Sequence, residues 1–273
     1  MSVTHGAQST ASRAADSKPL EALARAGFIG YGLVHLLLAW LALQIAFGNA
    51  NQEGDQSGAM QTLAKQPLGK TLLVAVAIGL AAMALWQALE AAFGHRQERG
   101  RSRTLERLAS VGRTVMYSYF AYTAYKVFSD ANSSSADSQQ QWSEQMMSST
   151  GGRWLVGLAG VGLAALGIGM VVYGIKKKFL KHLHTGRMSA KTRQLSQRLG
   201  MAGYTAKGSV YGVAGLLVVV AAVTYDPNKA RGLDAALRTL RDQPYGQVIL
   251  VLMALGLAAF AAYCIIQSRY RKV

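Results

Sequence analysis

Six long apolar stretches constrain what this chain can fold into. They run approximately over 28–47, 68–93, 109–128, 154–175, 203–223 and 246–267. A helix needs roughly 20 apolar residues to cross about 30 Å of hydrocarbon, and each stretch approaches or exceeds that length. The stretch 109–128 is the least apolar, because it carries Arg113 and Lys126 and relies on tyrosines. We count this stretch as a transmembrane helix because the spans are then evenly spaced along the chain. The sequence therefore predicts an all-α integral membrane protein with six transmembrane helices.

Basic residues alternate between the segments that connect these helices. Counting Lys and Arg gives 19 in one alternate set of segments and 7 in the other. The first set is 1–27, 94–108, 174–202 and 267–273, and the second is 48–70, 129–153 and 224–246. Cytoplasmic segments of membrane proteins carry such an excess, so we expect both termini in the cytoplasm. The formal net charge of +16 then mostly sets topology, and we expect no nucleic-acid partner.

The tetrapeptide Gly-Leu-Ala-Ala occurs three times, always in the second helix of a pair, at 79–82, 162–165 and 256–259. The first helices repeat too, since each has a Leu four residues before a Gly, namely Gly27, Gly112 and Gly203. This is an internal repeat of a two-helix unit. Each unit returns to the side on which it began, which makes the units parallel repeats about an axis along the membrane normal. The predicted fold is a pseudo-threefold bundle.

The repeats also fix the expected boundaries and connections. They are a polar cytoplasmic tail at 1–22, repeat 1 at 23–94, repeat 2 at 105–180, a basic cytoplasmic linker at 181–197, repeat 3 at 198–268 and a basic tail at 269–273. Repeats 1 and 3 share Gln-Pro-x-Gly before the second helix, whereas repeat 2 has lost that Pro. The leucine spacing of "GLDAALRTLRDQPYG" predicts a short interfacial helix, with a shorter version in "GAMQTLAKQPLG". Residues 142–146 suggest an interfacial turn.

Glycines in the apolar stretches are candidates for close helix packing, which small residues permit in lipid. We expect this role for Gly79, Gly162, Gly208, Gly212 and Gly256. Gly208 and Gly212 also form a G-x-x-x-G motif, which can mediate dimerisation. Contact within the bundle is favoured over contact between chains, while a homo-oligomer or a membrane-protein partner stays open.

Three two-helix units with L-x-x-x-G opening the first helix and G-L-A-A in the second resemble a known family. It is the bacterial membrane-protein family catalogued as domain of unknown function 1206. The resemblance covers nearly the whole chain after about residue 20. It implies a multi-pass protein of the bacterial plasma membrane, and it supplies no activity.

Polar residues within the apolar stretches are the best candidates for a site, since ionisable groups are costly in a membrane. Tyr31 and His35 align with Lys207 and Tyr211 of repeat 3, and each pair is four residues apart on one helical face. With Glu90 as counter-charge, they predict a polar pocket open to the cytoplasm. The alternative, which the sequence favours, is a packed histidine, Lys and Arg side chains that reach the interface, and one ion pair of Glu90 with Lys207 or with Arg113.

A basic cluster follows the fourth apolar stretch and includes Lys176, Lys177, Lys178 and Lys181. Topology explains these charges, and their number also predicts binding of anionic lipid headgroups. The sequence His182-x-His184 lacks a third ligand, and Cys264 is the single cysteine, so we expect no metal and no cofactor.

Two classes of function remain, because no catalytic motif occurs and we expect no enzyme. The first is a structural protein that binds lipid or a protein partner. The alternative is a small channel or carrier for an ion or small solute that uses the polar pocket. All four prolines lie outside the apolar stretches, which slightly favours the first class, because carriers often have broken helices.

Overall fold

The structure is a computed structural model that describes residues 18–48, 53–93, 100–130 and 134–271. In those residues the chain is all-helical, as predicted, apart from one isolated bridge between Leu183 and Arg271. The α-helices are α2 (Lys18–Ala46), α3 (Gln56–Ala64), α4 (Gly69–Phe93), α5 (Gly100–Ser129), α6 (Ser135–Met147), α7 (Thr150–Ile175), α8 (Ala190–Thr224), α9 (Gly232–Arg241) and α10 (Gly246–Tyr270). Three 3₁₀ segments, η1 (Lys178–His182), η2 (Thr185–Arg187) and η3 (Pro227–Ala230), lie in the connections.

Five helices of the described residues are long and apolar enough to cross a membrane. They are Arg25–Ala46 within α2, α4, α7, α8 and α10. The sixth predicted span forms a helix, α5, of 30 residues, but it does not meet the same apolar requirement. Its first turns carry charged side chains such as Glu106 and Arg107, and tyrosines replace aliphatic residues further on.

The Gln-Pro-x-Gly motifs of repeats 1 and 3 form the same turn before α4 and α10. The third residue, Leu68 or Tyr245, has a left-handed backbone with φ of 60° or 61°. That conformation is unfavourable for a residue with a side chain, so the turn stores a small strain energy. In repeat 2, which lacks the Pro, Ser149 caps α7 and accepts a hydrogen bond from the Gly152 amide at 3.1 Å. The entry to α7 therefore differs from the entries to its counterparts.

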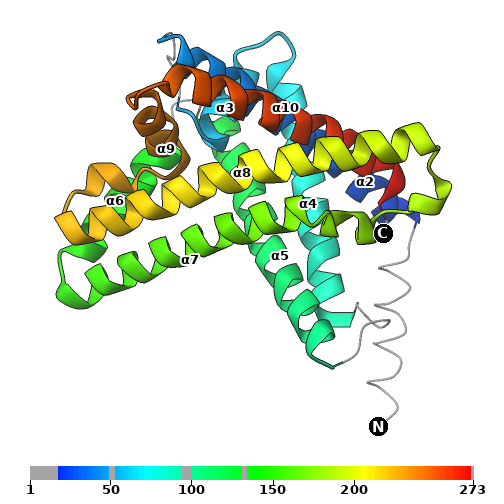
Figure 1. Ribbon diagram of the computed structural model, residues 1–273, viewed down its shortest axis with the longest axis horizontal. Coiled ribbons are helices and arrows are strands. Elements are labelled where there is room, and N and C mark those ends of the chain that lie inside the picture. The colour runs from blue at the N-terminus through cyan, green and yellow to red at the C-terminus, as the bar shows by residue number, and fades with distance from the viewer. Residues whose placement is uncertain (1–17, 49–52, 94–99, 131–133, 272–273) are drawn as a thin grey trace.

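The long helices pack mainly between consecutive repeats. The closest pairs are α4 with α5, α7 with α8, and α10 with α2. Each pair joins the second helix of one repeat to the first helix of another, and the pair α10–α2 returns from repeat 3 to repeat 1. Figure 1 shows α7 and α8 side by side along their length, while α5 crosses the view steeply. The three pairs surround a common centre.

Glycines lie at the closest helix crossings, although not at every predicted position. A Cβ atom on Gly79 would lie 3.0 Å from Gly27 Cα, and one on Gly208 would lie 2.6 Å from the Gly167 carbonyl oxygen. A Cβ on Gly256 would collide with Ala206. Small residues permit such backbone approach. Glycine at these three predicted positions therefore allows α2–α4, α7–α8 and α8–α10 to pack.

The prediction for Gly162 is wrong. A Cβ on Gly162 would meet nothing within 4 Å, so this glycine of repeat 2 is not at a crossing. The reason is that α7 packs on α8 through another helical face, which carries Gly160 and Gly167. Gly212 does lie at that crossing, because a Cβ on Gly167 would be 2.4 Å from the Gly212 amide nitrogen, although a Cβ on Gly212 itself would meet nothing within 4 Å.

The short helices α3, α6 and α9, one from each repeat, gather at one end of the bundle and are called the cap below (Figure 1). The predicted helix at α9 is confirmed, but its leucines pack toward the core, where Leu237 is 1% exposed. Residues 142–146 belong to the full helix α6 rather than to a single turn. The opposite end, which carries η1, η2 and the end of α10, is called the basic end.

Arg231 ties the cap together across all three repeats. Its guanidinium lies 3.0 Å from Asp137 of α6 and 3.6 Å from Glu53, which precedes α3. It also lies 3.9 Å from Asp234 of α9 and donates to the Gln140 side chain at 3.0 Å. The Asp234 carboxylate in turn accepts a hydrogen bond from the Gly54 amide at 2.8 Å. The cap is therefore one connected polar network.

Candidate functional site

A cavity of about 690 Å³ occupies the centre of the bundle. Its wall takes residues from all six long helices and from the three cap helices, and most of the wall is apolar or aromatic. Ligand sites in proteins commonly have volumes of 300–1,000 Å³ and a few polar groups in an apolar wall. The axis of the bundle is thus hollow.

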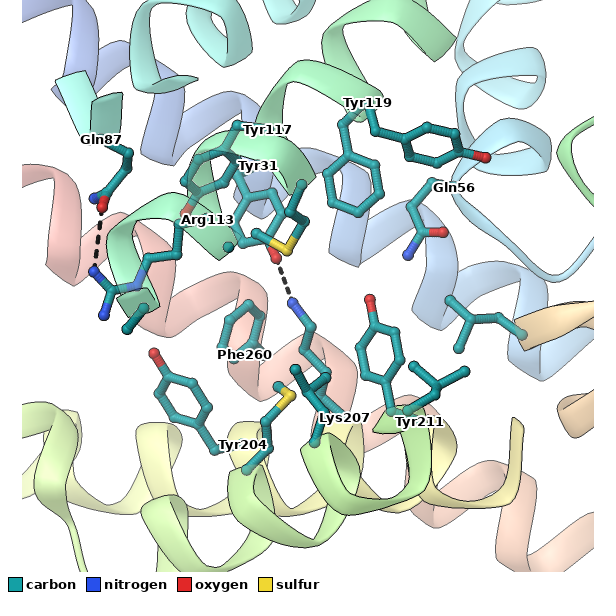
Figure 2. A pocket seen from close by; sticks show the side chains of 18 of the residues that line it. Tyr31, Gln56, Gln87, Arg113, Tyr117, Tyr119, Tyr204, Lys207, Tyr211 and Phe260 are labelled. Atoms are coloured by element: carbon teal, nitrogen blue, oxygen red, sulfur yellow. Dashed lines mark hydrogen bonds between the residues drawn. The ribbon is translucent and has the colours of Figure 1, made fainter. Parts of the chain in front are cut away.

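Lys207 of α8 is the central polar group of the cavity. Figure 2 shows its side chain reaching across from α8 toward Tyr31 of α2. The Nζ atom donates a hydrogen bond to the Tyr31 hydroxyl. It also lies 4.6 Å from the ring centre of Phe260 and 5.8 Å from that of Tyr211, within range of cation–π attraction. The lysine is 5% exposed and is held by aromatic groups.

In the described residues, no carboxylate pairs with Lys207. The predicted ion pair between Glu90 and Lys207 is therefore wrong. Glu90 lies half-buried on α4, outside the described lining of the cavity, and it has an interaction of its own. The physical reason is the packing order, because α4 packs on α5 and α2 and not on α8.

Two arginines line the cavity toward the basic end. Arg113 of α5 donates a hydrogen bond to the Gln87 side chain at 3.2 Å, shown in Figure 2, and lies 3.7 Å from Glu106. Arg271, at the end of α10, is 8% exposed, and its Nε atom is buried without a hydrogen-bond partner. With Lys207, they give the cavity lining three basic side chains, which come from α5, α8 and the end of α10.

Asp55 is the one acidic residue in the described lining, and it lies in the cap. Its Oδ1 atom caps α3 by accepting a hydrogen bond from the Gly58 amide at 3.0 Å, while Oδ2 is buried without a partner. Burial, together with the nearby carboxylates of Glu53 and Asp234, raises the pKa of Asp55 from 3.8 to about 7. The cap end of the cavity therefore holds a carboxyl group that is largely neutral below pH 7.

The cavity wall is incomplete between α5 and α7. Both helices contribute lining residues, such as Gly112 and Leu166, but they do not form a packed pair. Leu166 is 53% exposed, whereas its repeat counterparts Met83 and Phe260 are 0% and 3% exposed. The two helices of repeat 2 are thus splayed, whereas α2 packs on α4 in repeat 1 and α8 packs on α10 in repeat 3.

The structure brings three of the five predicted pocket residues together. Tyr31, Lys207 and Tyr211 line the cavity, with the Tyr211 ring beside Lys207 in Figure 2. His35 lies just outside the lining, where its Nδ1 donates to the Tyr31 carbonyl oxygen at 2.8 Å and its ring packs 4.7 Å from Phe260. It is a packed histidine, which agrees with the alternative interpretation.

The predicted lipid-contact lysines lie at the basic end. Lys176, Lys177 and Lys178 are exposed, whereas Lys181 bonds to Glu106 of α5. No group of three metal-ligating side chains occurs in the described residues, and these include His182 and His184.

Sequence reasoning missed Arg271 and Tyr204 as cavity residues. Arg271 follows the last apolar stretch and was counted only as a topological charge. Tyr204 follows the repeated Gly203 directly, as Arg113 follows Gly112 in repeat 2. The repeat alignment therefore carried a signal for Tyr204, but none for Arg271.

Comparison with known proteins finds the same three units. A family model described as Domain of Unknown Function (DUF1206) matches residues 26–94, 108–177 and 202–271. The chain is also 33% identical over 261 residues to the uncharacterized protein YxxB of Bacillus subtilis (strain 168). That match covers 94% of this chain and 93% of the relative. No solved structure matches with comparable significance.

Proposed function

The chain belongs to the family described as Domain of Unknown Function (DUF1206), and we propose that it binds an amphiphilic molecule, taken from the bilayer, in its central cavity. In this proposal the six long helices span a bacterial plasma membrane as a pseudo-threefold bundle. Both termini and the basic end face the cytoplasm, and the cap lies on the outer side. The proposal assigns no chemical reaction to the cavity.

The topology is supported by length and charge. Five helices are long and apolar enough to span, and α5 is long enough and packs on α4 along the bundle. Within its apolar stretch 109–128, Arg113 and Lys126 lie near the two ends, from which long side chains can reach the interface. The 19-to-7 distribution of basic residues supports a cytoplasmic basic end.

Binding from the bilayer is supported by the splayed helices α5 and α7. The gap between them gives a lateral route from lipid to an apolar cavity, and one wall of that cavity carries polar groups. The buried Lys207 in the otherwise mostly apolar lining of this cavity is the observation that carries the proposal.

A channel or carrier is the alternative, and it requires a path through the cap. The network around Arg231 joins all three repeats at that end and opposes such a path. Binding without passage is therefore the simpler function.

The test is to fill the cavity. A Cβ on Gly112 meets nothing within 4 Å, and Gly112 lines the cavity, so Gly112→Trp places its bulk there without displacing a helix. Gly169→Trp is the matched control, because Gly169 is exposed on α7 and also faces open space. We expect native mass spectra of the parent and the control to show a bound amphiphile that Gly112→Trp lacks. An equal load in all three proteins, or none in the parent, would refute the proposal.

A further inference from the structure

We infer that the molecule in the cavity carries an anionic head, a carboxylate or a phosphate, that binds at Lys207 with support from Arg113 and Arg271. This inference rests on the proposed function and names the chemical class of its ligand. It is carried by the charge and hydrogen bonding of the cavity wall.

As an ammonium ion, Lys207 has no carboxylate partner among the described residues. An ammonium group removed from water is costly unless it is paired, and the aromatic faces of Tyr31 and Phe260 compensate only part of that cost. Its hydrogen bond to the Tyr31 hydroxyl uses one of three donors. An anion in the cavity would take the remaining donors.

The arginines extend this positive surface toward the basic end. Arg271 offers a buried Nε–H without a partner, and in the described residues it has no ion pair with a carboxylate. Arg113 pairs with Glu106 at 3.7 Å and donates hydrogen bonds to the Gln87 and Ser110 side chains, so it adds positive charge here but is not a free donor. The one acidic lining residue, Asp55, belongs to the cap at the opposite end. The acidic lining residue therefore lies at the cap end, whereas the two arginines lie toward the basic end and Lys207 lies at the centre.

Tyrosine hydroxyls complete the donor set. Figure 2 shows the Tyr204 and Tyr211 side chains on either side of Lys207, both projecting from α8 into the cavity. A phenol O–H donates readily to a carboxylate or phosphate oxygen. The apolar wall of α5 and α7, including Met116 and Leu163, would then contact an acyl chain. The anion therefore comes with a hydrocarbon tail, as a lipid does, rather than as a free ion.

The experiment compares heads that share one tail. Binding of dodecyl phosphate, dodecanoate, dodecanol and inorganic phosphate to the full chain would be measured by native mass spectrometry and by thermal shift. We expect both charged amphiphiles to bind more tightly than dodecanol, since hydrogen bonds to a charged group strengthen binding roughly ten- to a hundredfold. Inorganic phosphate alone should bind weakly, and tight binding would refute the lipid source.

Variants at Lys207 separate this inference from the proposed function. Lys207→Gln should lose the preference for the charged heads, and Lys207→Arg should retain it. Lys126→Gln, on the exposed end of α5, is the control and should bind like the parent. If dodecanol binds as well as dodecyl phosphate, the anionic head is wrong while the cavity function stands. If none of the amphiphiles binds, the proposed function fails.

A second inference comes from a different observation, the glycines of the repeats. In repeat 1 a Cβ on Gly27 would lie 2.5 Å from Met83 Cγ, and in repeat 3 a Cβ on Gly203 would lie 2.7 Å from Phe260 Cα. The counterparts in repeat 2 are Gly112 and Leu166, and a Cβ on Gly112 meets nothing within 4 Å. Repeat 2 thus has a glycine and an apolar residue at the positions that meet in repeats 1 and 3, but Gly112 and Leu166 do not touch.

The geometry points to a second arrangement in which α5 closes on α7 by the crossing already made in repeats 1 and 3. Gly112 would then receive Leu166, and the lateral gap of the cavity would be shut. Small residues at both faces make the approach sterically possible, since Gly162 and Gly112 both face open space. The splayed and closed hairpins would be the open and shut forms of the cavity.

A disulfide across the crossing tests this closure. In a Cys264→Ala background, the pair Gly112→Cys and Leu166→Cys should form a disulfide in oxidised native membranes, seen as a linked peptide after digestion. The control pairs Gly112→Cys with Ile168→Cys, which is 65% exposed on α7. A yield for the Leu166 pair no higher than that of the Ile168 pair would overturn the closure.

Discussion

Asp55 makes the stability of the cap depend on pH. The perturbation is Asp55→Asn, which removes the titrating group and keeps the helix cap, because Asn is as good an N-cap as Asp. The amide oxygen can still accept the hydrogen bond from Gly58 that the Asp55 carboxyl group accepts now. Any difference between parent and variant in how stability changes with pH is then due to titration of the Asp55 carboxyl group.

The sign follows from the raised pKa. Burial lifts the pKa of Asp55 from 3.8 to about 7, so the folded state favours the neutral acid. The resulting stabilisation is fully present below pH 3.8 and is lost as the pH rises through 7. One pKa unit corresponds to about 1.4 kcal/mol, and the two units between pH 5 and 7 give a loss of about 3 kcal/mol.

The assay is thermal unfolding in detergent between pH 5 and pH 8. We expect the parent to lose stability relative to Asp55→Asn over this range, and the two curves to converge at low pH. Asp226→Asn is the control, since Asp226 caps η3 at a half-exposed site and should leave the parent slope unchanged. Parallel curves for the parent and Asp55→Asn, or a parent that gains relative stability with pH, would refute the reasoning.

Three further outcomes are expected. Gly208→Leu should destabilise the bundle by about 1–3 kcal/mol or more in thermal unfolding, while Gly162→Leu should unfold like the parent. Equal unfolding temperatures for the two variants would contradict the assigned crossing at Gly208. Arg231→Ala should cost on the order of 1 kcal/mol by loosening the cap, whereas Lys229→Ala, which breaks an exposed pair, should cost less in the same assay. Asn228→Cys should react with an impermeant thiol reagent added outside intact cells, and protection there would reverse the proposed orientation.

Much of the fold could be predicted because the repeats leave period and spacing in the sequence. The six long helices and the short helix α9 follow from apolar runs and leucine spacing, although α5 and α8 extend well beyond their apolar stretches. The packing of Gly79 and Gly256 followed from their shared tetrapeptide. The same tetrapeptide misled at Gly162, because a motif copied into repeat 2 does not show whether its partner helix lies against it.

The site was less predictable, because it depends on which helices adjoin. Spacing of four residues correctly placed Tyr31 with Lys207 and Tyr211, since each pair shares a helical face. The choice of Glu90 as counter-charge required α4 beside α8. No local sequence pattern shows which helices lie next to each other, and α4 packs on α5 and α2 instead. Arg271 was hidden by its position, since a charge after the last span is explained equally well by topology.

The cavity follows from the divergence of one repeat within a ring held by its neighbours. Helix α5 packs on α4, and α7 packs on α8 through close glycine contacts, and in this arrangement the two helices of repeat 2 are held apart. Repeat 2 also differs from the other repeats in the turn before its second helix, which Ser149 caps, and in its tyrosine-rich first helix. Repeats 1 and 3 therefore act as the scaffold that presents Lys207. In the proposed function, repeat 2 supplies the opening through which the amphiphile reaches Lys207.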